Sequence, residues 1–203
     1  MTTTEKTQHN KELILTAAIK TLAKYGYAGT TVTLVAEAAG VSRGLLHYYF
    51  HNTEVLLAEA TDLAFGPLFE MMGGLFDQAE DAAQLAHILT VQTRAAVRED
   101  PESMALMIEA LAVARHPGPV QDKMLAMLLA APGLMLGGLS RMQASGKAHP
   151  LVPLNYLPNL LTALLDGMGL QIMLRPELVE DDGLWEAMEQ MIRTLIGGPA
   201  TEK

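Results

Sequence analysis

The sequence contains no cysteine and few aromatic residues, and both absences narrow the chemistry open to the protein. Without cysteine there can be no disulfide, thiolate zinc site, iron–sulfur cluster or thiol nucleophile. Aromatic residues make up 5% of the 203 residues, so the core must be built mainly from aliphatic side chains and the 13 methionines. Hydrophobic residues make up 50% of the chain, which is enough for a packed core and argues against wholesale disorder.

A secretion signal and long uninterrupted apolar segments are also missing. The first twelve residues, MTTTEKTQHNKE, are polar and lack the hydrophobic stretch of a signal peptide. The longest uncharged runs, 124–140 and 148–165, are broken by prolines and are short for a membrane span. We therefore expect buried helices in a cytoplasmic protein that does not associate with membranes.

Positive charge is scarce, since 14 Lys and Arg face 23 Asp and Glu and the net charge is −9. Such an acidic total argues against a protein that coats nucleic acid over its whole surface. The balance changes along the chain, because residues 1–54 carry five basic and four acidic side chains and the rest carries nine and nineteen. A local DNA contact in the N-terminal quarter is therefore compatible with the charge.

Strand signals are absent, and apolar residues recur with helical spacing almost throughout. In residues 10–25 they fall at every third or fourth position, and no Asn-Gly or Asp-Gly hairpin signal lies between β-branched runs. We predict an all-α fold of about nine helices, with bends at Pro67 and Pro132. The expected helices are one ending at the Gly26–Gly29 corner and others at about 32–39, 43–49, 53–78, 82–98, 102–115, 119–145, 155–174 and 183–196.

Residues 30–50 have the signature of two short helices joined by a tight turn. Thr31 and Ser42 are placed to cap the N-termini of the two helices, and Gly40 can adopt the left-handed backbone that ends the first. Val41 is placed to fill the angle between them. This is the geometry of the helix-turn-helix, whose second helix enters the major groove of DNA.

The same segment resembles the tetracycline-repressor (TetR-like) family of bacterial transcriptional regulators. The resemblance covers about residues 12–58, and its motifs occur in the family's order. They are Gly26, Tyr27, Thr30-Thr31-Val32, Ala36, Gly40-Val41-Ser42, Arg43-Gly44, Leu46, Tyr49-Phe50, Asn52, Glu54 and Leu56. Beyond them the chain resembles the family only in length, helix count and the stretch Leu165-Asp166-Gly167. The resemblance implies a three-helix DNA-binding domain at 1–52 and a larger helical effector-binding and dimerisation domain at 53–203.

The residues expected at DNA follow from this resemblance and from their own chemistry. Arg43 can bind a guanine edge or a phosphate, Gly44 lets the backbone approach closely, and Leu45 can contact a thymine methyl. His47 stands where the family usually has Tyr, and Thr53 where it commonly has Lys, which removes one charged contact. The full expected set is Thr31, Thr33, Ser42, Arg43, Gly44, Leu45, His47, Tyr48 and Thr53. Tyr49 and Phe50 are expected in the core instead.

The resemblance further implies an effector pocket between the middle helices. Methionines at helical spacing are individually more often core residues, but together they can form an adaptable apolar lining. The expected effector-binding residues are Phe65, Phe69, Met72, Met104, Met107, Ile108, Met124, Met127 and Gln171. Polar groups that could also orient a ligand, or face solvent or salt bridges instead, are Gln92, Arg94, Glu109, Arg115 and Arg141.

A homodimer formed by the last two helices of each subunit is also implied. The helix expected at 155–174 is apolar on nearly all faces, which is more than packing within one chain needs. The expected interface residues are Leu161, Asp166, Met168, Leu170, Met188, Ile192 and Leu195. Asp166 is the single charge in its run, and it either faces solvent or forms an ion pair across the interface.

These expectations describe a ligand-responsive regulator, in the first instance a repressor, that binds a palindromic operator as a homodimer and is released by a small apolar or amphipathic effector. The alternative is a helical carrier of apolar molecules whose DNA-binding face is vestigial. An enzyme is not expected, because the sequence has no HExxH motif, phosphate-binding glycine loop or histidine cluster. His47 and His51 lie four residues apart without a third ligand, so neither a metal nor a cofactor is expected.

Overall fold

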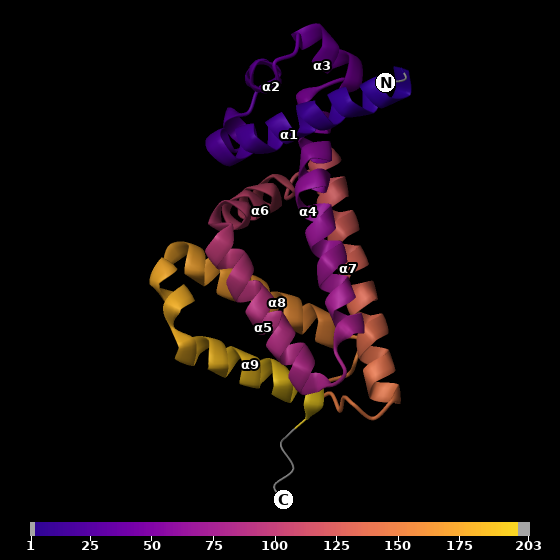
Figure 1. Ribbon diagram of the computed structural model, residues 1–203, viewed down its shortest axis with the longest axis vertical. Coiled ribbons are helices and arrows are strands. Elements are labelled where there is room, and N and C mark those ends of the chain that lie inside the picture. Colours follow the sequence, from indigo (N-terminus) through magenta and orange to yellow (C-terminus); the bar gives the residue numbers. More distant parts are fainter. Residues whose placement is uncertain (1–2, 199–203) are drawn as a thin grey trace, which may run out of the picture. The chain divides into compact units, whose positions relative to one another are not determined.

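The computed structural model describes residues 3–198, except for the side chains of residues 3, 4, 68, 69, 72 and 73 (Figure 1). Every regular element in this described range is helical, so the all-α prediction is confirmed. The elements are α1 (Thr3–Gly29), α2 (Val32–Ala39), α3 (Arg43–Tyr49), α4 (Thr53–Gln78), α5 (Ala82–Glu99), α6 (Pro101–Val113), α7 (Pro119–Ala144), α8 (Leu157–Leu174), the short 3₁₀ helix η1 (Pro176–Glu180) and α9 (Asp182–Gly197).

From α2 to α9 each α-helix boundary lies within two residues of its predicted position. The agreement has a local cause, because side chains at the helix starts bind the free backbone N–H groups of the first turn. Asp81 Oδ1 accepts a hydrogen bond from Gln84 N at 2.8 Å, and Asp181 Oδ1 accepts one from Leu184 N at 3.1 Å. The element missed from sequence is η1, where Pro176 begins a single tight turn in a segment expected to be a loop.

Contacts between helices divide the chain into two compact units. The first consists of the residues up to Leu68 together with Ala105–Leu128, and the second of Phe69–Met104 together with the residues from Leu129 onward. Fully buried residues in the first unit include Ile14, Ala18, Val35, Leu46, Phe50 and Met124. Those in the second include Leu85, Leu89, Leu139, Leu157, Leu161 and Ile192. The division into domains at residues 52 and 53 concerns function and stays a prediction.

Two helices, α7 and α8, are long and apolar enough to cross a membrane by length and composition alone. Both also supply core residues to their units, as the core helices of soluble domains do, for example Leu139 in α7 and Leu161 in α8. Only 33% of the apolar stretch of α7 and 39% of that of α8 are buried, so each helix keeps an exposed apolar face. The expectation of no membrane association stays a prediction.

Candidate nucleic-acid interface

The turn between α2 and α3 is closed by the residues that the sequence pattern selected. Thr31 Oγ1 accepts a hydrogen bond from Leu34 N at 3.3 Å, and Ser42 Oγ accepts one from Leu45 N at 3.1 Å. Gly40 lies in the left-handed region with φ 66° and ψ 29°, which favours glycine. These bonds satisfy backbone groups at the start of each helix, so both predicted caps and the left-handed turn are confirmed.

The inner side of the helix-turn-helix is firmly packed. Leu46 of α3 and Phe50 just after it are both 0% exposed, and Val35 of α2 is equally buried. The ammonium of Lys11 on α1 lies 5.8 Å from the centre of the Phe50 ring, within reach of a cation–π interaction. Phe50 is thus a core residue, as expected, and it holds the end of α3 in place beneath α1.

The outer side of α3 is open to solvent. Arg43, Gly44 and His47 are exposed, and Tyr48 is 74% exposed with its ring edge-on to that of Tyr49, 5.2 Å between centroids. Of the other residues expected at DNA, Thr31, Thr33 and Ser42 are exposed and Leu45 and Thr53 are half-buried. Seven of the nine expected residues are thus exposed and two are half-buried, and they lie at α2, at α3 and at the start of α4.

The end of α1 is anchored to two helices far along the chain within the same unit. The N–H of Tyr27 donates to Glu109 Oε2 on α6 at 2.9 Å, and the Tyr27 hydroxyl pairs with Thr61 Oγ1 on α4 at 2.5 Å. Burial raises the pKa of the Tyr27 phenol, and the nearby Glu109 carboxylate raises it further against the lowering effect of Thr61. Lys11 Nζ pairs with Glu59 Oε2 on α4 at 2.7 Å. These contacts set the position of the helix against which α2 and α3 pack.

The residues expected to bind an effector are divided between the two units. Phe65, Met124 and Met127 are buried in the first unit, where Met107 and Ile108 are half-buried. Met104 and Gln171 belong to the second unit, where Met104 is half-buried and Gln171 is exposed. The side chains of Phe69 and Met72 lie outside the described residues. Membership of an effector site stays a prediction for this set.

Three of the polar candidates for ligand binding have structural roles instead. Arg94 Nη1 pairs with Asp182 Oδ1 at 2.7 Å and its Nε donates to the carbonyl of Val179 at 2.9 Å, which ties α5 to η1 and α9. Arg141 pairs with Asp77, and Glu109 anchors Tyr27. Salt bridges were an expected alternative for these residues, but the sequence did not identify the partners, because each partner lies more than sixty residues away along the chain. Gln92 and Arg115 are exposed.

The expected dimer residues need correction. Leu161, Met188 and Ile192 are 0%, 2% and 0% exposed in the core of their own chain, so their side chains cannot meet a partner. Leu170 is exposed, as a residue of an interface must be, and the other exposed apolar residues of α8 lie on the same helix face. These others are Leu160, Ala163 and Leu174. On α9 the exposed apolar residues are Ala187 and Met191. Met168 of α8 and Leu195 of α9 are half-buried.

Asp166 is exposed on α8, four residues before Leu170. Partial burial of its carboxyl nevertheless removes enough water to raise the pKa of that group above the ordinary 3.8. An ionised carboxylate in a partly apolar setting costs free energy unless a hydrogen bond or an ion pair replaces its lost contacts with water. Both interpretations of Asp166, a solvent-facing group and half of an ion pair between subunits, stay open at this point.

Comparison with known proteins places these features in a family. Residues 14–60 match the model described as "Bacterial regulatory proteins, tetR family". The uncharacterized HTH-type transcriptional regulator YhgD of Bacillus subtilis is 45% identical over 49 residues, which are 24% of this chain and 26% of that protein. The HTH-type transcriptional repressor AcnR of Corynebacterium glutamicum is 27% identical over 170 residues, 80% of this chain and 81% of AcnR.

A solved structure extends the likeness to the remaining helices. The transcriptional regulator FadR from Bacillus subtilis, in complex with stearoyl-CoA, has a TM-score of 0.71 at 18% identity, covering 93% of this chain and 98% of FadR. Identity at that level shows a shared fold, whereas the sequence match of residues 14–60 shows shared DNA-reading machinery. The named relatives are transcriptional regulators and not enzymes. The chain is accordingly similar to the TetR-like bacterial transcriptional regulators, in sequence over residues 14–60 and in fold over most of its length.

Proposed function

We propose that this protein is a repressor that binds a palindromic operator as a homodimer and leaves it when a small apolar or amphipathic effector binds. The observation that carries the proposal is the solvent-open outer face of α3, held by a buried inner face and two capped helix starts. A helix presented in this way fits the major groove. The match of most of the chain to the repressor AcnR supports repression.

Reading of the operator would depend on few charges. Arg43 is the one Lys or Arg among residues 30–53, so it is the residue best suited to bind a guanine edge. The hydroxyls of Thr31, Thr33 and Ser42, the His47 ring and the Tyr48 phenol would donate to phosphates, which positions α3 without reading sequence. Thr53 would add its hydroxyl at the start of α4.

A single three-helix DNA-binding domain (residues 1–52), here called the reader, contacts few base pairs. A two-fold dimer is therefore needed for affinity and specificity. The exposed apolar face of α8 supports a dimer, because Leu160, Leu170 and Leu174 are 44%, 43% and 71% exposed. Met191 of α9 is also exposed, at 50%. Exposed apolar side chains of this kind are typical of a subunit interface.

The effector would be a molecule with a long apolar part, bound between helices of the effector-binding domain proposed at residues 53–203. The methionine-rich composition supports an adaptable apolar site, and the structural neighbour FadR binds stearoyl-CoA. Binding must favour the DNA-free arrangement by about 1–3 kcal/mol to change operator occupancy substantially. The cytoplasm is the proposed location, since both DNA and metabolites of this kind occur there.

Gel-shift titration of the region upstream of the protein's own gene, followed by footprinting, tests the proposal. We expect a palindromic footprint in wild type and at least about a tenfold loss of affinity in Arg43→Ala, because one guanine contact per half-site disappears. Arg115→Ala, also exposed but outside the helix-turn-helix, is the matched control. Stearoyl-CoA is the first effector probe, and it should release the complex.

The carrier alternative predicts a different result. If the protein carries apolar molecules and its DNA-binding face is vestigial, Arg43→Ala will leave weak, sequence-independent DNA binding unchanged. Binding of the fatty-acyl probe would then occur without any effect on DNA. A palindromic footprint that is lost in Arg43→Ala and released by the probe excludes this alternative.

A further inference from the structure

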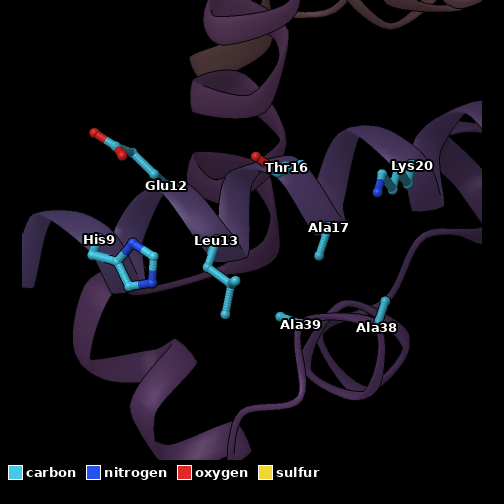
Figure 2. A pocket seen from close by; sticks show the side chains of 8 residues that line it. All are labelled: His9, Glu12, Leu13, Thr16, Ala17, Lys20, Ala38 and Ala39. Atoms are coloured by element: carbon cyan, nitrogen blue, oxygen red, sulfur yellow. The ribbon is translucent and has the colours of Figure 1, made fainter. Parts of the chain in front are cut away.

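A shallow trough lies between α1 and α2, and no residue of α3 lines it. It consists of two adjoining hollows of about 330 and 280 Å³ that share Lys20 and Ala38, and we call it the α1–α2 trough. Figure 2 shows the first hollow, in which Leu13 and Ala17 of α1 point toward Ala38 and Ala39 of α2. The floor is therefore apolar, and Leu13 remains 41% exposed on it.

Two oppositely charged side chains of α1 line the first hollow of the trough. The Glu12 carboxylate accepts a hydrogen bond from Gln8 Nε2 at 2.7 Å but forms no ion pair with any described residue. Lys20, which lines both hollows, likewise has no ion-pair partner within the described range. By contrast, Lys11 on the same helix is paired with Glu59. Glu12 and Lys20 are eight residues apart, which is about 12 Å along a helix.

This pattern is complementary to itself. We propose that the α1–α2 trough docks the trough of a second copy of this chain, with the two α1 helices antiparallel and a two-fold axis near Thr16. Glu12 of each copy then faces Lys20 of the other, and the exposed Leu13 of each copy lies against the apolar floor of the other trough. In an isologous contact every pair of unlike residues occurs twice, and the Glu12–Lys20 pair does so in this arrangement.

The contact is weak by itself and acts between copies that DNA has already brought together. Stable interfaces bury about 1,200–2,000 Å², which is far more than a shallow trough offers, and exposed ion pairs contribute little each. Two dimers on neighbouring operator sites have a high effective concentration relative to each other. A weak contact between them can therefore strengthen DNA binding measurably. Because α3 does not line the trough, one reader can bind DNA and a neighbouring copy together. The inference goes beyond the proposed function by adding cooperativity between dimers.

The Glu12–Lys20 pairing is tested with charge-reversed variants of the protein. Their binding is measured on duplexes that carry one or two copies of the footprinted site. We expect wild type to bind the second site about fivefold more tightly than the first, and both Glu12→Lys and Lys20→Glu to abolish this difference. The double variant Glu12→Lys/Lys20→Glu restores opposite charges and should recover the cooperativity. Lys6→Glu, an equal charge change at an exposed position of α1 outside the trough, is the control and should keep it.

The absence of cysteine allows a second test that needs no operator. Thr16→Cys places one thiol per chain beside the proposed axis, and mild oxidation should link two copies at high protein concentration and faster on the two-site duplex. Ala23→Cys, exposed on α1 but outside the trough, should not be linked at a comparable rate. Sedimentation of the linked species should show two dimers joined.

The outcomes separate this inference from the proposed function. Single-site binding without cooperativity, or Thr16→Cys that links no faster than Ala23→Cys, overturns the trough contact and leaves the regulator intact. Failure of the double variant to recover cooperativity while both single variants lose it also overturns the contact. Thr16-specific linkage in a protein that recognises no operator would overturn the proposed function and support the contact.

Discussion

At the scale of the residue, the backbone requires glycine at one of two positions in the helix-turn-helix and not at the other. Gly40 has φ 66°, and a side chain there would be strained even though no atom lies within 4 Å of the position of its Cβ. Gly44 lies inside α3, where an added Cβ would meet Ser42 Oγ at an ordinary 3.9 Å. Gly40 is thus needed for the turn, whereas the fold does not require glycine at position 44, where we expect it to allow close approach to DNA.

Alanine substitutions should separate these two roles. We expect Gly40→Ala to lower the free energy of unfolding by about 1 kcal/mol, because a left-handed conformation disfavours a Cβ. Gly44→Ala should raise it by about 0.5–1 kcal/mol, since glycine is a poor residue inside a helix, yet weaken operator binding. Urea unfolding and gel shifts measure both effects. Unchanged operator affinity in Gly44→Ala would contradict its expected position against DNA.

The Asp166 carboxyl provides a pH-dependent test at the same scale. Its pKa is raised in the folded state, so the folded state takes up the proton more readily than the unfolded chain and is penalised when the carboxyl is ionised. Asp166→Asn should therefore be more stable than wild type at pH 7. The difference should shrink as the pH falls through the raised pKa and vanish below the ordinary 3.8, as urea midpoints would show.

That substitution also distinguishes the two interpretations of Asp166. A solvent-facing group in an apolar setting gains stability on conversion to Asn and leaves dimerisation unchanged. A carboxylate that pairs with a cation of the partner subunit would instead lose dimer affinity at pH 7. Sedimentation of both proteins at pH 7, alongside the unfolding curves, separates these results.

At the scale of the element, α1 is the helix that connects the reader to the rest of the first unit. Its end is broken at Gly26, where φ is 67°, and the next residue, Tyr27, is bound by Glu109 of α6 and Thr61 of α4. A Cβ on Gly26 would lie 2.5 Å from Glu109 Oε2, so the glycine makes room for the carboxylate. Movement of α6 would therefore displace the end of α1 directly.

Removal of the carboxylate should loosen this element. We expect Glu109→Ala to lower the free energy of unfolding by about 1–2 kcal/mol, because the N–H of Tyr27 loses its acceptor, and to weaken operator binding. Glu109→Gln keeps an oxygen acceptor and should recover most of both. Glu102→Ala, exposed in the first turn of the same helix, is the control. Equal effects in the two alanine variants, measured by urea unfolding and gel shift, would contradict an anchoring role.

At the scale of the whole molecule, helices α7 and α8 both have exposed leucines. Leu129 of α7 is 76% exposed and Leu174 of α8 is 71% exposed. The exposed leucines of α8 form the proposed dimer contact, while no partner is proposed for the face of α7. Substitutions on the two faces should therefore behave differently.

A charge on the α8 face should dissociate the proposed dimer. Leu170→Glu is expected to raise the dimer dissociation constant at least about tenfold, because a buried carboxylate without a partner is costly, and to weaken operator binding through loss of the second reader. Leu129→Glu, the same change on α7, should leave the dimer intact. Analytical ultracentrifugation compares them. If Leu129→Glu dissociates the dimer and Leu170→Glu does not, the interface lies on α7 and the proposal for α8 is wrong.

The sequence by itself determined the helices, their caps and the helix-turn-helix, because spacing, Thr31, Ser42 and Gly40 act within a few residues of chain. Tertiary structure alone decided which apolar residues are free to meet a partner. The sequence expected Leu161, Met188 and Ile192 at an interface, but packing between distant helices buries them in their own core. The same reason applies to Glu109 and Arg94, since a side chain's partner across the fold depends on how helices far apart in sequence come together, which local pattern does not encode.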